Sequence, residues 1–266
     1  MTGQERTLNQ QLRDCYERLA RLGLLGEAPE PLSVVEVVEE HRWHWRPARV
    51  KVLLLAESHV YTQETELVVM ARAKAFKVPD RFVRLVYCLG YGETDFVGRD
   101  VSPTGTPQFW KVLFSCANPV SESTAFDSLL KTRNPSFERR IAAKVELLAT
   151  LKSMGVWLVD ASIVALYRGS RAGPDTKLRK KRIIQECWEH YVCAHLKRAE
   201  PSYTVIIGKG VADALGNSVA QVTNGAHSVV EQPQARLTSD RQWEIFNYYH
   251  QVCRRYCSGD STQLSR

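Results

Sequence analysis

The sequence of 266 residues lacks several features that would place it in a specialised class. No run of about 18 apolar residues occurs, and the first residues, MTGQERTLNQQ, lack the apolar core of a signal peptide. The seven cysteines are scattered, odd in number and without a C-x-x-C pair, which argues against a zinc ribbon or a disulfide framework. The sequence IGKG at 207–210 is too short for a phosphate loop. We therefore expect a cytoplasmic protein with reduced thiols and no metal or organic cofactor.

The chain carries an excess of positive charge. Its formal charge is +7 and its pI about 9.1, which favours an anionic partner without identifying it. Basic residues gather between positions 168 and 182, where they suit contacts with phosphate groups. A solvated helix face is the alternative interpretation of such a run. The residues that we expect to contact phosphates are Arg168, Ser170, Arg171, Lys177, Lys180 and Lys181.

Apolar patterning predicts an α/β protein. Strands are expected at 50–56, 156–159, 203–207 and 228–230, and helices at 139–154, 178–198, 210–215 and 239–256. Alternation of strands with helices predicts a three-layer α/β/α sandwich with a central, mostly parallel four-stranded sheet. We expect an N-terminal helical extension (1–45), the α/β domain (46–257) and a polar tail (258–266). The cluster HRWHWR at 41–46 is read as aromatic packing, with a metal or base-stacking cluster as the alternative.

Ligands of open parallel sheets bind beyond the carboxyl ends of the strands, so the segments that follow the predicted strands should converge there. Four segments stand near this edge: LLLAESHVY (53–61), TPQFWKVLF (106–114), GVWLVD (155–160) and VVEQPQARLT (229–238). Their order and spacing resemble the uracil-DNA glycosylase-like superfamily, with most likeness to its mismatch-specific and hypoxanthine-type members. The resemblance implies a monofunctional glycosylase that flips a base out of duplex DNA and hydrolyses its N-glycosidic bond, leaving an abasic site. It also implies a monomer that needs no cofactor and has no membrane partner.

Within the first segment, the resemblance places Glu57 and His59 where a group must direct water at the sugar. Ser58 stands at the position that is a carboxylate in the uracil enzymes, and it cannot fill that role. Val60 replaces a bulky ring that walls off carbon 5 of the base, which implies a roomier pocket. Tyr61, the next residue, could refill the space.

The middle segments supply the expected base contacts. Asp160 stands where the uracil enzymes carry an asparagine that reads the base edge. An ionised Asp only accepts hydrogen bonds, and cytosine presents an amino donor at position 4, so the residue favours a cytosine-type base. Phe109 is read as a core residue or as part of the pocket wall. Together with Val60, Asp160 suggests cytosine that carries a group on carbon 5, as in bacteriophage DNA, and hence an antiviral role.

The last segment resembles the loop that follows the final strand in this superfamily. By position, Gln232 and Gln234 would donate hydrogen bonds to the departing base, and Arg236 or Leu237 would fill the space left by the flipped nucleotide. Two alternatives stay open. The chain could be a uracil or hypoxanthine repair glycosylase, or a DNA-binding module of the same fold that has lost catalysis.

Overall fold

The computed structural model describes residues 3–98, 105, 107–167, 174–223, 226–232 and 237–258. The helices are α1 (Gly3–Arg21), α2 (Leu32–His44), α3 (Ala73–Phe76), α4 (Thr94–Val97), α5 (Pro107–Ala117), α6 (Phe137–Met154), α7 (Pro174–Cys187), α8 (Cys193–Ala199), α9 (Lys209–Leu215) and α10 (Ser239–Cys257), with short helical segments η1 (Glu64–Glu66), η2 (Ser123–Phe126), η3 (Trp188–Val192) and η4 (Gly216–Gln221). The strands are β1 (Val52–Ala56), β2 (Val156–Asp160), β3 (Tyr203–Ile207) and β4 (His227–Val230). No helix in these ranges is both long and apolar enough to cross a membrane.

The four strands form one parallel sheet in the order β2-β1-β3-β4. This confirms the predicted four-stranded, parallel arrangement. Every residue of β1 and β2 is buried, as expected for apolar strands covered on both faces. Ala56 is opposite Asp160, and Leu55 is opposite Ile206. The carboxyl ends of β1, β2 and β3 therefore reach the same edge of the sheet.

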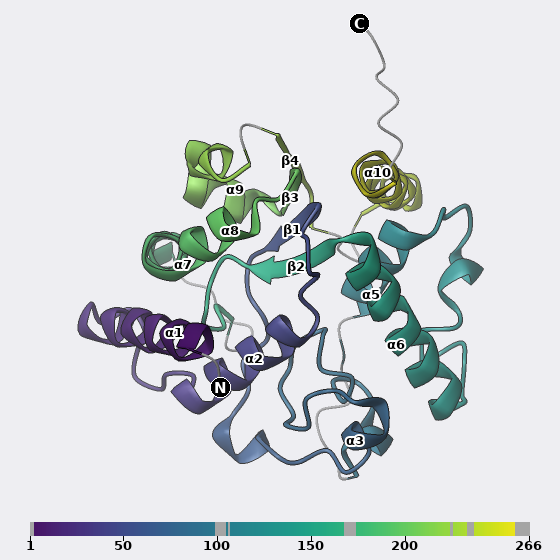
Figure 1. The fold of residues 1–266 in the computed structure, drawn as a ribbon, viewed down its shortest axis with the longest axis horizontal. Coiled ribbons are helices and arrows are strands. Elements are labelled where there is room, and N and C mark those ends of the chain that lie inside the picture. The colour runs from purple at the N-terminus through teal and green to yellow at the C-terminus, as the bar shows by residue number, and fades with distance from the viewer. Residues whose placement is uncertain are drawn as a thin grey trace, which may run out of the picture.

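Helices cover both faces of the sheet, which confirms the three-layer sandwich. In Figure 1, α1, α7, α8 and α9 lie on one side of the strands, and α5, α6 and α10 lie on the other. α6 ends at Met154, and the next residue, Gly155, has a φ of 93°, a left-handed conformation that favours glycine; β2 begins directly after it. This tight connection places β2 directly against the helix that precedes it.

The N-terminal helices pack on the α/β body. Leu12, Cys15 and Leu19 of α1 are fully buried, and Arg18 donates to Glu186 at 2.6 Å. α2 was not predicted from the sequence. At its end the Trp43 ring lies 5.5 Å from the Trp157 ring, in line with aromatic packing as the interpretation of the HRWHWR cluster. The described N-terminal residues thus contribute to the same core as the sheet.

Candidate functional site

A cavity of about 360 Å³ lies beyond the carboxyl ends of β1, β2 and β3. Several segments that are distant in sequence meet there, as the parallel topology requires. Its described lining residues are Glu57, Ser58, His59, Val60, Arg84, Leu85, Val86, Gly105, Pro107, Gln108, Phe109, Leu158, Asp160, Tyr167, Ile207 and Gln232. This set includes seven sequence-predicted site residues: Glu57, Ser58, His59, Val60, Phe109, Asp160 and Gln232. Tyr61 follows Val60 in the chain but is not among the described lining residues, and Gln234 lies outside the described residues.

Asp160, the last residue of β2, turns its carboxylate toward a buried cation. Arg42 donates from one guanidinium nitrogen to Oδ2 of Asp160 at 2.8 Å and from another to Glu39. Tyr191 also donates to Glu39, at 3.1 Å. The side chains of Arg42 and Asp160 are only 3% and 5% exposed, so this pair is screened very little by water. Both described contacts of Asp160 use Oδ2, and Asp160 is among the residues that line the cavity.

His59 is held between two acidic side chains. Its Nε2 lies 2.9 Å from Oε2 of Glu30, and its Nδ1 lies 3.5 Å from Oδ2 of Asp160. Glu30 also accepts hydrogen bonds from the backbone N–H groups of Thr62, at 3.1 Å, and Ala165, at 2.8 Å. The buried Glu30 therefore ties the loop before α2 to the loops after β1 and β2.

These contacts set the protonation states at the base of the cavity. Burial by itself would lower the pKa of His59, but the charges of Glu30 and Asp160 outweigh it and raise the pKa to about 9. Burial would likewise raise the pKa of Asp160, but Arg42 and His59 hold it below its ordinary value. At neutral pH His59 is therefore an imidazolium, which cannot accept a proton from water, and Asp160 is a carboxylate, which only accepts hydrogen bonds.

Glu57 occupies a different environment from His59. It follows β1, is partly exposed, and accepts a hydrogen bond from the hydroxyl of Tyr167 at 2.7 Å. The ammonium group of Lys180, on α7, lies 3.4 Å from the centre of the Tyr167 ring. Of the two candidates for directing water, Glu57 is thus the one that is accessible and carries a carboxylate, whereas His59 is buried.

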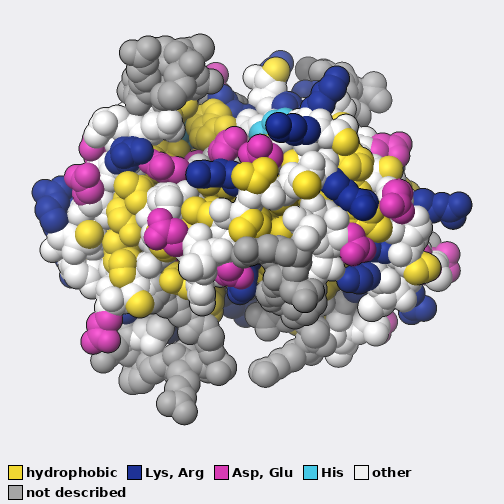
Figure 2. Space-filling model, turned by 90° about the horizontal axis from the view of Figure 1, so that it is seen from below, with side chains coloured by type: hydrophobic (Ala, Val, Ile, Leu, Met, Phe, Trp, Pro, Cys, Tyr) yellow, Lys and Arg dark blue, Asp and Glu magenta, His cyan; other side chains and the backbone are white. Residues whose placement is uncertain are grey.

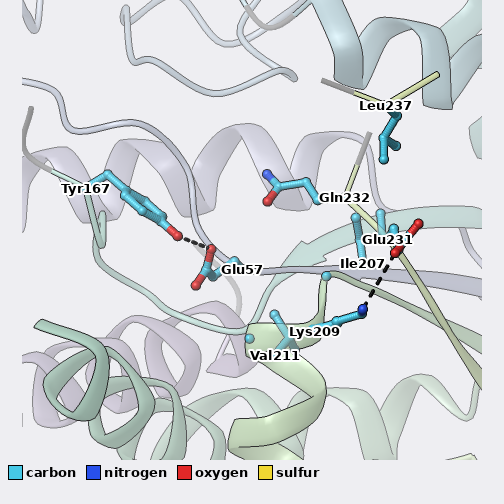
Figure 3. A pocket seen from close by; sticks show the side chains of 10 residues that line it. Glu57, Tyr167, Ile207, Lys209, Val211, Glu231, Gln232 and Leu237 are labelled. Atoms are coloured by element: carbon cyan, nitrogen blue, oxygen red, sulfur yellow. Dashed lines mark hydrogen bonds and ion pairs between the residues drawn. The ribbon is translucent and has the colours of Figure 1, made fainter. Parts of the chain in front are cut away.

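A second cavity of about 350 Å³ adjoins the first one. Glu57, Tyr167, Ile207 and Gln232 line both cavities. Figure 3 shows Tyr167 and Glu57 facing each other on one side, the ion pair of Lys209 with Glu231 on the other, and Gln232 between them. Leu237, which was predicted to contact DNA, lines this second cavity. Glu57 and Gln232 therefore stand where the two cavities meet.

Only part of the predicted phosphate-binding set is described. Lys177 and Lys181 are exposed on α7, whereas Lys180 is partly buried against Tyr167. Burial lowers the pKa of Lys180. On the face seen in Figure 2, basic and acidic side chains are interspersed among the described residues and form no continuous basic band. The other predicted members, Arg168, Ser170 and Arg171, lie outside the described residues, and so does Arg236, which was predicted to fill the space left by the flipped nucleotide.

Glu30, Arg42, Arg84 and Tyr167 are among the residues of the site that were not predicted from the sequence. Arg84 lines the cavity and pairs with Glu66. Ser58, a predicted pocket residue, accepts a hydrogen bond from the backbone N–H of Leu166 at 3.2 Å, so it also fixes the loop after β2. The described residues contain no group of three or more histidine, cysteine or acidic side chains that could hold a metal ion. Comparison of the chain with protein-family models, curated proteins and solved structures finds no match.

Proposed function

We propose that this protein is a monofunctional DNA glycosylase whose cavity receives a base flipped out of the duplex. The observation that carries the proposal is the meeting of Glu57, Asp160 and Gln232 around one cavity, from three segments that the resemblance had picked out independently. A volume of about 360 Å³ is within the usual range for small-molecule sites, about 300–1,000 Å³. It leaves room for a pyrimidine ring and a substituent.

The proposed reaction divides among the lining residues. Water attacks carbon 1′ of the sugar, the bond from that carbon to the base nitrogen breaks, and its electron pair leaves with the base. Glu57 directs the water, takes up its proton and faces the positive charge that develops on the sugar. Gln232 donates to the base, which becomes negative as it departs. His59 stays protonated and acts by fixing Asp160.

The charge state of Asp160 supports a cytosine-type substrate. An ionised Asp160 accepts a hydrogen bond from the amino group at position 4 of cytosine, whereas uracil carries at that position a carbonyl, which is itself an acceptor. Part of the cavity wall is apolar and is formed by Val60, Leu85 and Val86. A substituent on carbon 5 of the base would lie against this wall. Since unmodified cytosine in host DNA must be spared, we propose a modified cytosine as substrate and defence against bacteriophage as the role.

The test is base release from a panel of duplexes. DNAs that contain uracil, hypoxanthine, 5-hydroxymethylcytosine or glucosylated hydroxymethylcytosine are incubated with the protein, and mild alkali then cleaves any abasic site. We expect the wild type to cleave a modified-cytosine duplex and Glu57→Gln to lose this activity. The control variant Glu122→Gln changes an exposed carboxylate directly before η2 and should keep the activity. Asp160→Asn should lose that activity. Release of uracil or hypoxanthine alone would support the repair alternative, and DNA binding without any release would support the inactive module.

A further inference from the structure

The carboxylate of Glu57 is bounded on two sides by residues to which the proposed reaction assigns no role. Oε2 accepts a hydrogen bond from the hydroxyl group of Tyr167 at 2.7 Å. Oε1 lies beside Gly210, near enough that a Cβ on this glycine would stand 3.3 Å from it. Tyr167 comes from the loop after β2 and Gly210 from the first turn of α9, so elements beyond two different strands determine where the carboxylate points.

Tyr167 itself is held in place although it is 48% exposed. The ammonium group of Lys180 sits 3.4 Å from the ring centre, which is within the range of a cation–π contact. An exposed tyrosine without such support would sample several rotamers. Together with Lys180, the ring forms a brace between α7 and the carboxylate.

Gly210 has no conformational requirement for glycine. Its φ is not positive, and it lies inside α9, where alanine is the better helix former. A methyl group there would come against Oε1 and Cδ of Glu57, at 3.3 and 4.0 Å. A larger residue at position 210 would therefore fill the space next to the carboxylate of Glu57.

We propose that Tyr167 and Gly210 are positioning residues that hold Glu57 in the orientation needed to direct water at the sugar. The proposal rests on the proposed glycosylase function. Neither residue touches the reacting atoms: Tyr167 acts through a hydrogen bond and Gly210 through the room it leaves. Because misplacing a catalytic group by about 1 Å can reduce the rate about 100-fold, both contacts should matter for the chemical step.

The experiment compares Tyr167→Phe and Gly210→Ala with the wild-type chain under single-turnover conditions, on whichever duplex the wild type cleaves. Tyr167→Phe removes one hydroxyl and keeps the ring under Lys180. Gly210→Ala adds one methyl. We expect the rate of base release to fall about 10- to 100-fold in Tyr167→Phe and by a smaller factor, about fourfold, in Gly210→Ala, where the methyl group displaces the carboxylate by much less than 1 Å, while the Kd for the duplex changes by less than about twofold in both. Tyr256→Phe, in the last turns of α10, is the matched control and should keep the wild-type rate.

Melting temperature separates positioning from damage to the fold. Gly210→Ala should melt no lower than the wild type, because alanine suits a helix better than glycine. A wild-type rate in either variant would overturn the positioning role, and so would a rate loss that is matched by a loss of DNA affinity. If the wild type releases no base from any duplex, the proposed glycosylase function is refuted. If the wild type is active and both variants match it, only the positioning role is refuted.

Discussion

Replacing Arg42 with methionine tests how strongly the charges behind the cavity depend on one another. Its guanidinium pairs with Asp160 and Glu39, and its side chain is 3% exposed. Methionine keeps the apolar bulk but leaves two buried carboxylates without this cation. Breaking a buried pair by removing one partner costs about 3–5 kcal/mol. Two carboxylates lose their partner, but His59 still faces Asp160. We therefore expect urea unfolding at pH 7.5 to show a loss of unfolding free energy within the range for one broken pair, not twice that range.

The effect of this substitution should depend on pH in a defined direction. The folded-state pKa of Asp160 is lowered, so in the wild type it contributes stability above its unfolded pKa that is lost as pH falls through the folded value. In Arg42→Met, burial without Arg42 favours the protonated carboxyl group, and acid relieves the penalty. The deficit relative to the wild type should therefore be smaller at pH 5 than at pH 7.5.

The matched control is Arg13→Met, which breaks an exposed pair with Glu36. The side chain of Arg13 is 49% exposed, and such surface pairs contribute about 0–1 kcal/mol. If Arg42→Met loses no more stability than Arg13→Met, or loses the same amount at both pH values, the reasoning about the buried charges is refuted.

Three further predictions concern other parts of the chain. The pKa of His59 is raised in the folded state to about 9, from an ordinary value of 6.5, so its protonation stabilises the folded protein fully below pH 6.5, and this contribution is lost as pH rises through 9. Urea unfolding should show that the unfolding free energy of the wild type falls by about 3 kcal/mol between pH 6.5 and 9, and that His59→Gln lacks this fall. Gly155→Ala should lower the unfolding free energy by more than about 1 kcal/mol, because φ is 93° and the new Cβ would lie 2.8 Å from the carbonyl oxygen of Arg49; an unchanged urea midpoint would contradict this. Cys193 is the one cysteine of the described chain that is not buried, so a thiol reagent should label one group rapidly in the native protein and all seven in denaturant.

The strands and the later helices could be predicted because their signals are local. β1 and β2 are short apolar runs, and such runs are typical of strands that are covered on both faces. α2 was not predicted because its apolar residues do not form such a clear local pattern. Its valines at 34, 35, 37 and 38 are all buried, so the segment lacks the one-sided apolar stripe that identifies a surface helix.

The partners within the site could not be predicted, because they depend on contacts between distant residues. Arg42 meets Asp160 from 118 positions away, and Tyr167 meets Glu57 from 110 positions away. Glu30 stands in a Pro-containing stretch that is typical of a linker, yet it is 3% exposed and pairs with His59. The sequence suggested His59 as a candidate for directing water at the sugar; only its two acidic neighbours, Glu30 and Asp160, indicate that it is a cation.

The central claim, that the cavity releases a base from DNA, is tested most directly by identifying the product. Duplex DNA that contains 5-hydroxymethylcytosine, or its glucosylated form, is incubated with the wild type and with Glu57→Gln, and the small-molecule fraction is analysed by mass spectrometry. The account predicts the free modified base from the wild type, an abasic strand of matching mass, and neither from Glu57→Gln. Intact DNA with every duplex of the panel, or equal release by both proteins, would contradict it.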